Sequence, residues 1–221
     1  MYRKLENQKI ATTSWTFHTL LFHCVLLGFL INGTALAIEE PKYEVALSQG
    51  EFELRRYAPH IIAATYIDGD FSNVGNEGFR RLAGYIFGGN RSRQQLSMTA
   101  PVTLNPQSEK IAMTAPVSQQ SFGNQWRITF TMPTSYTIET LPIPNDSRVE
   151  LQEVSEQLVA TLRYSGSSNN ASYQKRERML LDWISDKGWI IESSPTFARY
   201  DAPYVPWFLR RNEILIEVTV D

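Results

Sequence analysis

The chain has 221 residues, of which 43% are hydrophobic and 20% are charged, and its formal net charge is −2. This composition is typical of a globular protein with a sizeable core and excludes extended disorder as its main state. The small net charge, and the lack of any run of Lys and Arg interleaved with aromatic residues, argue against nucleic acid as a partner.

The first 37 residues differ in character from the rest. Three basic residues lie near the start, residues 15–31 are almost wholly apolar, and residues 35–37 read Ala-Leu-Ala, which suits a signal peptidase. We expect residues 1–37 to be a cleaved secretory signal, so that residues 38–221 form an exported domain, periplasmic or secreted. The alternative is an uncleaved membrane anchor through residues 15–31, although this stretch is marginally short for about 30 Å of hydrocarbon.

Cleavage would also change the reactive side chains of the protein. It would remove Cys24, the only cysteine, and would leave His60 as the only histidine. The mature domain could then form no disulfide and would depend on its core for stability.

Short strand-like stretches alternate with two helix-like segments from residue 42 onward. Apolar residues at helical spacing predict helices over residues 72–87 and 172–187, ended by Gly88 and Gly188, with Ser172 as the N-cap of the second. Strands are predicted over residues 43–47, 51–57, 61–67, 126–132, 158–164, 197–200 and 213–220. The order predicts an α+β fold of two pseudo-symmetric strand-helix-strand halves.

The first predicted helix contains three glycines, Gly75, Gly78 and Gly84. Each costs up to about 1 kcal/mol relative to Ala inside a helix. Close approach of a sheet or of a flat ligand would explain why they are there.

A five-residue phrase, Met-Thr-Ala-Pro-Val, occurs at residues 98–102 and again at residues 113–117. A turn-like stretch lies between the copies, so we expect them on neighbouring strands, each interrupted by its proline. With this repeat, the chain resembles the SOUL heme-binding family from about residue 42 to residue 220. The other matching stretches are residues 43–45, 52–59, 78–90, 110–112, 200–203 and 210–214.

The resemblance implies a distorted β-barrel of two similar halves, similar to the effector-binding domains of certain bacterial transcription regulators. It also implies that heme or another tetrapyrrole binds in a largely apolar groove next to the first helix. The candidate groove residues on that helix are Phe79, Arg80, Leu82, Ala83 and Ile86. Most of this apolar face would also be needed for the core, while Arg80 could pair with a propionate or simply lie in solvent.

One position departs from the family pattern. Some animal members carry a histidine just before the tyrosine that corresponds to Tyr57, and this histidine is a proposed iron ligand, whereas this chain has Arg56 there. His60 is therefore the remaining imidazole candidate for heme iron, and its alternative is a surface position at the start of a strand.

The resulting hypothesis is a carrier or buffer for heme or another tetrapyrrole outside the cytoplasm. Another apolar small molecule is one alternative, and a protein-interaction role through the apolar stretch at residues 204–209 is a second. We expect no enzymatic activity and no other cofactor, because the sequence contains no nucleophile motif and no metal-binding spacing.

Overall fold

A computed structural model describes residues 38–93, 107–167 and 169–220. The predicted signal or anchor over residues 1–37 and the first copy of the repeated phrase lie outside these ranges. In the part of the chain that is described, no helix is both long enough and apolar enough to span a bilayer.

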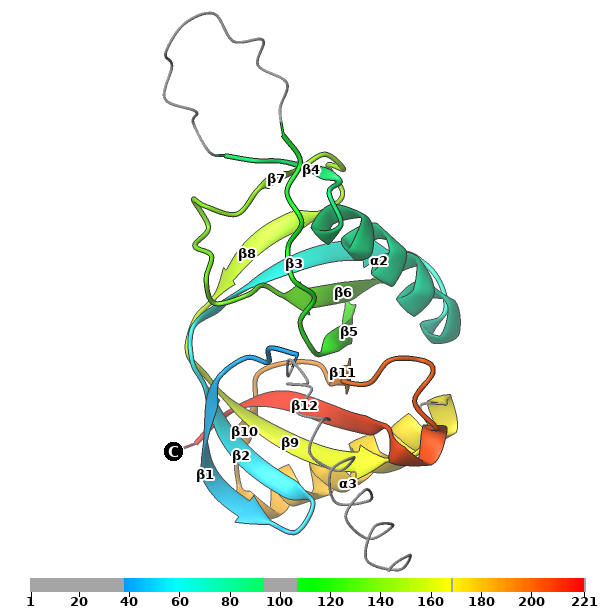
Figure 1. The fold of residues 1–221 in the computed structure, drawn as a ribbon. Helices are drawn as coiled ribbons and strands as arrows, with labels where there is room; N and C mark the ends of the chain where they lie inside the picture. The colour runs from blue at the N-terminus through cyan, green and yellow to red at the C-terminus, as the bar shows by residue number, and fades with distance from the viewer. Residues whose placement is uncertain (1–37, 94–106, 168, 221) are drawn as a thin grey trace, which may run out of the picture. The chain divides into compact units, whose positions relative to one another are not determined.

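Ten strands form one strongly curled antiparallel sheet, and two helices pack on it (Figure 1). Nine of the strands follow the order β1-β2-β9-β12-β11-β5-β6-β3-β8, and β10 pairs with β12. The α+β class and the distorted barrel predicted from the sequence are confirmed.

The sheet divides into two halves, each covered by one helix. The first half contains β3 (His60–Ile67), α2 (Phe71–Ile86), β5 (Val117–Phe122), β6 (Gln125–Thr131) and β8 (Glu150–Val154). The second contains β1 (Tyr43–Gln49), β2 (Phe52–Tyr57), β9 (Gln157–Ser165), α3 (Asn170–Lys187), β10 (Ile190–Ile191), β11 (Thr196–Arg199) and β12 (Arg211–Thr219). Short strands β4 (Asn90–Arg91) and β7 (Ile143–Pro144) form a separate pair, and a 3-10 turn, η1 (Trp207–Leu209), precedes β12.

The strand registers relate the two halves by an approximate twofold axis. At its centre β5 pairs with β11, and the order outward is β6-β3-β8 on one side and β12-β9-β2 on the other. Arg127 in β6 lies opposite Gln120 in β5, just as Glu213 in β12 lies opposite Ala198 in β11. Arg127 and Glu213 are therefore equivalent positions. By the same registers His60 is equivalent to Gln157.

Each half buries its own apolar core between helix and sheet. Leu82 and Ile86 of α2 pack with Ile128 and Phe130 of β6, while α3 packs through aromatic residues such as Trp183. Alternate residues of each strand point to opposite faces, so the neighbours of Ile128 and Phe130 face the concave side of the curled sheet.

Glycine lets α2 lie close to the sheet. A Cβ at Gly78 would come within 2.4 Å of Ile128 Cγ1, whereas a Cβ at Gly84 would meet no atom within 4 Å. The expected close approach of a sheet is thus found at Gly78 but not at Gly84.

The structure corrects some details of the predicted elements. The N-cap of α3 is Asn169, whose side chain accepts a hydrogen bond of 2.8 Å from the Ser172 amide, so the prediction of Ser172 was wrong. Gly188 ends α3 in the left-handed conformation, as predicted. Strands β5 and β8 were not anticipated, because their polar sequences show no clear alternation.

Candidate functional site

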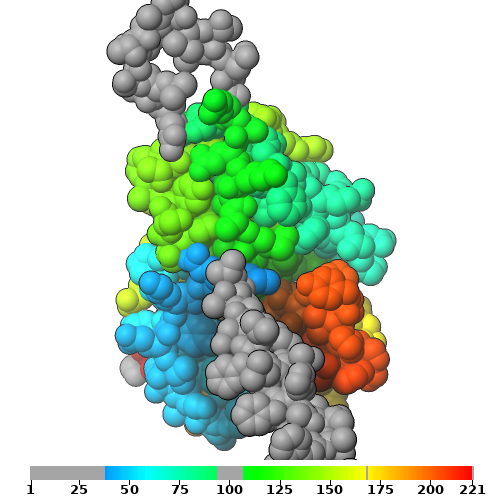
Figure 2. All heavy atoms as spheres, in the orientation of Figure 1, coloured from blue at the N-terminus to red at the C-terminus, as the bar shows by residue number. Residues whose placement is uncertain are grey.

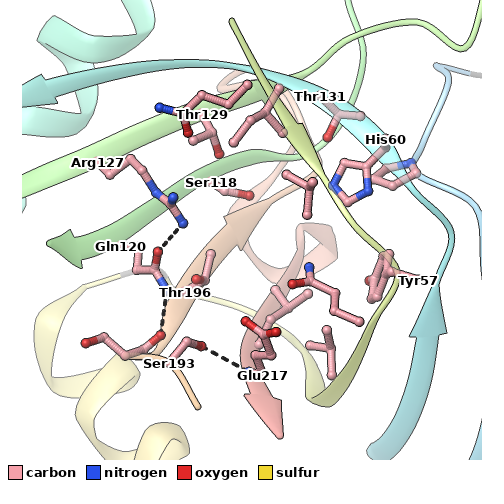
Figure 3. A pocket seen from close by; sticks show the side chains of 18 of the residues that line it. Tyr57, His60, Ser118, Gln120, Arg127, Thr129, Thr131, Ser193, Thr196 and Glu217 are labelled. Atoms are coloured by element: carbon pink, nitrogen blue, oxygen red, sulfur yellow. Dashed lines mark hydrogen bonds between the residues drawn. The ribbon is translucent and has the colours of Figure 1, made fainter. Parts of the chain in front are cut away.

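A cavity of about 570 Å³ lies on the concave face of the sheet, between the two halves (Figure 3). Strands of both halves supply its walls, including β3, β5, β6 and β8 from the first and β9, β11 and β12 from the second. Its volume falls within the roughly 300–1,000 Å³ of typical small-molecule sites. Because the helices cover the other face, neither α2 nor α3 lines it.

The cavity wall is polar and apolar in nearly equal measure. The polar lining side chains include Ser118, Gln120, Thr129, Thr131, Gln157, Thr196 and Glu217. The main apolar contributions come from Ile62, Val159 and Leu215 on the strands and from the rings of Tyr57 and Phe122. A ligand that fits here therefore needs polar groups as well as an apolar body.

His60 lines one side of this cavity and is the one histidine among the described residues. Its Nδ1 lies 2.9 Å from the backbone carbonyl oxygen of Ala58. A carbonyl only accepts, so Nδ1 donates this hydrogen bond, and Nε2 is the ring nitrogen left for another partner. This is the arrangement in which a histidine can bind a metal. His60 also borders a second hollow of about 450 Å³, lined by Met132, Tyr136 and Glu156 among others.

Arg127 lies at the far side of the cavity from His60 in Figure 3. Its Nη2 donates a hydrogen bond to Gln120 Oε1, and Gln120 Nε2 donates to the carbonyl of Ser194 at 2.8 Å. The guanidinium carbon lies 5.5 Å from the centre of the Phe122 ring. The half-buried cation is thus fixed in position by neutral groups.

A buried ion network borders the cavity on the second half. Arg55 donates to both oxygens of Glu213, at 2.7 and 3.2 Å, and Tyr200 Oη donates to Glu213 at 2.7 Å. Arg211 also donates to Glu213, at 3.0 Å. The Glu213 side chain is fully buried, and the Arg55 side chain is only 1% exposed.

Electrostatics keeps this network ionised while its phenols stay neutral. Burial acts to raise the pKa of Glu213, but the hydrogen bond and charge of Arg55, aided by Arg211, outweigh burial, so this pKa lies below its usual value. Burial raises the pKa of Tyr57 to about 12. Tyr57 and Tyr200 therefore present neutral phenol groups to the cavity.

The predicted groove residues lie together on α2 but not in this cavity. Leu82, Ala83 and Ile86 are buried in the first-half core. Phe79 is 37% exposed and packs 5.5 Å from the Phe130 ring, and the Nε of exposed Arg80 donates to the Asn76 carbonyl at 3.4 Å. A role for these five residues in ligand binding stays a prediction.

Sequence reasoning missed the polar residues that line the cavity. The alternation of Arg127, Thr129 and Thr131 with apolar residues in β6 was visible, and Glu217 lies similarly between apolar residues in β12. Such a pattern is typical of a sheet with one solvated face. Only the curl of the sheet, which brings the two polar faces together, turns them into a cavity.

Comparison with known proteins decides the family. The sequence matches the family described as SOUL heme-binding protein over residues 38–217. The chain belongs to this family. It is also 24% identical to mouse heme-binding protein 2 over 206 residues, which cover 86% of this chain and 95% of that protein. The human heme-binding protein 2 is 25% identical, with 85% of this chain and 89% of that protein covered.

Solved structures extend the likeness of the fold. The C-terminal domain of EcmrR aligns with a TM-score of 0.55 at 11% identity, over 81% of this chain and 99% of that domain. A structure described as a hydrolase from Listeria innocua aligns with a TM-score of 0.51 at 11% identity, over 79% and 94% of the two chains. At these identities the likeness concerns the fold alone.

Proposed function

We propose that this SOUL family member binds heme or another tetrapyrrole in the cavity between its two halves, without catalysing a reaction. The observation that carries the proposal is the cavity of about 570 Å³ with the His60 ring at its wall, oriented by the Nδ1 hydrogen bond to the Ala58 carbonyl. His60 would hold the iron, and the Ala58 carbonyl would fix the orientation of its ring.

The cellular role proposed with it is a carrier or buffer outside the cytoplasm. This part is motivated by the sequence of residues 1–37, which has the charge and the small residues of a secretory signal. Mass spectrometry of the protein recovered from its native cells would test it, since a chain that begins near residue 38 is expected and an intact N-terminus would contradict cleavage.

Titration with hemin tests ligand binding. The protein from residue 38 onward should give a saturable shift of the Soret band, and His60→Ala should move the band position of the loaded protein because the iron loses its imidazole ligand. Gln157→Ala is the matched control, since Gln157 is the equivalent position in the second half and lines the same cavity.

The control variant should give the wild-type spectrum. A wild-type titration no different from that of an unrelated protein would remove the tetrapyrrole proposal. A wild-type spectrum in loaded His60→Ala would instead remove His60 as the ligand.

A second candidate function is protein interaction, and a specific observation favours it. Tyr204 is 88% exposed, Trp207 is 62% exposed, and Phe208 and Leu209 of η1 are exposed beside it. The segment protrudes from the surface of the second half, in orange in Figure 2. Exposed apolar clusters of this kind mark contact sites in many proteins.

Substitution of this segment separates the two functions. Trp207→Ser with Leu209→Ser should leave the hemin titration unchanged, because neither residue lines the cavity. Loss of hemin binding in this variant would show that the segment serves the ligand site instead.

A further inference from the structure

The Arg127 side chain makes far fewer hydrogen bonds than a guanidinium group can. A guanidinium has five N–H donors. Within the described residues, the side chain of Arg127 makes one hydrogen bond, to Gln120, and its buried Nε has no partner. No carboxylate of the described chain forms an ion pair with it.

An unpaired cation in a half-buried position is costly. Arg55 and Arg211 avoid this cost, because Arg55 pairs with Glu213 and Arg211 pairs with Glu40. Half-buried Arg176 and Arg199 also have only neutral hydrogen-bond partners among the described residues, but they do not line the cavity. The neutral groups around Arg127 hold it rigidly but leave its charge uncompensated. A pre-positioned, unsatisfied guanidinium on a cavity wall suits a carboxylate, which can accept two parallel hydrogen bonds from it.

The acidic residues of the cavity restrict where such a carboxylate can lie. Glu217 is half-buried on the wall formed by β12, and Glu153 and Glu192 are exposed lining residues. Each of them would repel an anionic group nearby. Arg127 is therefore the favourable place for a ligand carboxylate.

The distance from Arg127 to His60 sets the size of the ligand. Thr131 lies opposite Ile62, near His60, and is four residues from Arg127 along β6. At about 3.4 Å per residue these two positions are roughly 13 Å apart. A ligand that reaches both ends must be extended, with its carboxylate at one edge.

We propose that Arg127, held by Gln120 and Phe122, binds a carboxylate at the edge of an otherwise uncharged, extended ligand. This inference rests on the proposed function in placing the ligand in the same cavity, and it adds the chemical group that the site selects. For a tetrapyrrole the group would be an acid side chain of the ring, directed away from His60.

Two flat probes that differ in one group test the inference without hemin. Pyrenebutyrate carries a carboxylate, and pyrenebutanol carries an alcohol on the same apolar body. The wild-type protein should bind the carboxylate about 10-fold more tightly than the alcohol, or better, because charge-assisted hydrogen bonds are stronger than neutral ones. Pyrene fluorescence measures both affinities.

Variants then assign the preference to Arg127. Arg127→Gln should bind both probes equally, and Arg127→Lys should keep part of the preference because it keeps the charge but loses the planar fork. Arg178→Gln is the matched control, since it removes the same charge from an exposed arginine of α3, which does not line the cavity. Its preference should equal that of the wild type.

The outcomes separate this inference from the proposed function. Equal wild-type affinities for the two probes, no binding of either, or an unchanged preference in Arg127→Gln would overturn the carboxylate site. A clear preference for pyrenebutyrate together with a negative hemin titration would support the carboxylate site and remove only the tetrapyrrole.

Discussion

Positions 127 and 213 occupy equivalent places in the two halves of the sheet, and the two side chains are bonded very differently. Glu213 receives hydrogen bonds from Arg55, Arg211 and Tyr200 and is fully buried. Arg127 has one neutral partner and faces the cavity. A saturated ion network stabilises one half, whereas the unsaturated cation of the other half is free to bind a ligand.

The helices show a parallel difference. Helix α2 lies close to β6 because Gly78 has no side chain, while α3 packs on its sheet through large rings, with the Tyr173 ring centred 4.5 Å from the Phe197 ring. The first half thus depends on close backbone approach and the second on aromatic packing.

The largest expected effect comes from breaking the buried ion network. Glu213→Gln should lower the free energy of unfolding by about 3–5 kcal/mol in urea denaturation, because Arg55 loses its fully buried counter-ion and keeps only the more exposed Glu53. The matched control is Glu156→Gln, which removes the partner of the neighbouring Arg56, where both side chains are about half exposed. That loss should be roughly 0–1 kcal/mol. Equal losses in the two variants would show that the network is not structural.

A smaller effect should come from filling the contact at Gly78. Gly78→Ala should lower the free energy of unfolding by about 1–3 kcal/mol, because the new methyl would overlap Ile128. Gly84→Ala in the same helix should raise it by roughly 0.5–1 kcal/mol, because that position is open and Ala favours the helix. Thermal or urea unfolding measures both, and destabilisation by both substitutions would contradict the proposed role of Gly78.

The smallest expected effect is a difference in acid sensitivity. The pKa of Glu213 is lowered in the folded state. The stabilisation that Glu213 adds to the fold is therefore fully present above its ordinary pKa near 4.5, and it is lost as the pH falls through the folded-state pKa. The free energy of unfolding of the wild type should therefore fall more steeply below about pH 4.5 than that of Glu213→Gln. Parallel pH profiles would indicate that Glu213 is not ionised in the fold.

The elements with strong periodicity could be predicted from the sequence, and the cavity could not. Both helices and the strands with alternating or continuous apolar residues are where the sequence places them, because their apolar faces must be buried. The polar strand β5 carries Gln119, buried against the start of α2, and Gln120, buried at the cavity wall beside Ser194, and both environments come from distant residues. The apolar stripe of α2 was correctly recognised, yet the structure uses most of it for the core.

The site residues were hidden for the same reason. His60 was singled out because it is the only histidine after residue 23, which is a fact of composition. Arg127 and Glu217 look like ordinary solvent-facing residues in their own strands. Whether these two residues line the same cavity depends on how far the sheet curls. The curl follows from the pairing of whole strands and not from any short stretch of sequence.

The pairing of β2 with β9 and of β3 with β8 has a consequence for synthesis of the chain. Phe52 lies opposite Leu162, so one edge of the β1-β2 hairpin remains without its partner until more than a hundred further residues have been made. A ribosome-bound chain that ends before β9 contains all strands of the first half but lacks most of the second, and the unpaired strand edges are open to wrong partners. Completion of the second half must therefore wait for synthesis of nearly the whole polypeptide, and a helper that shields these edges would be most useful during that interval.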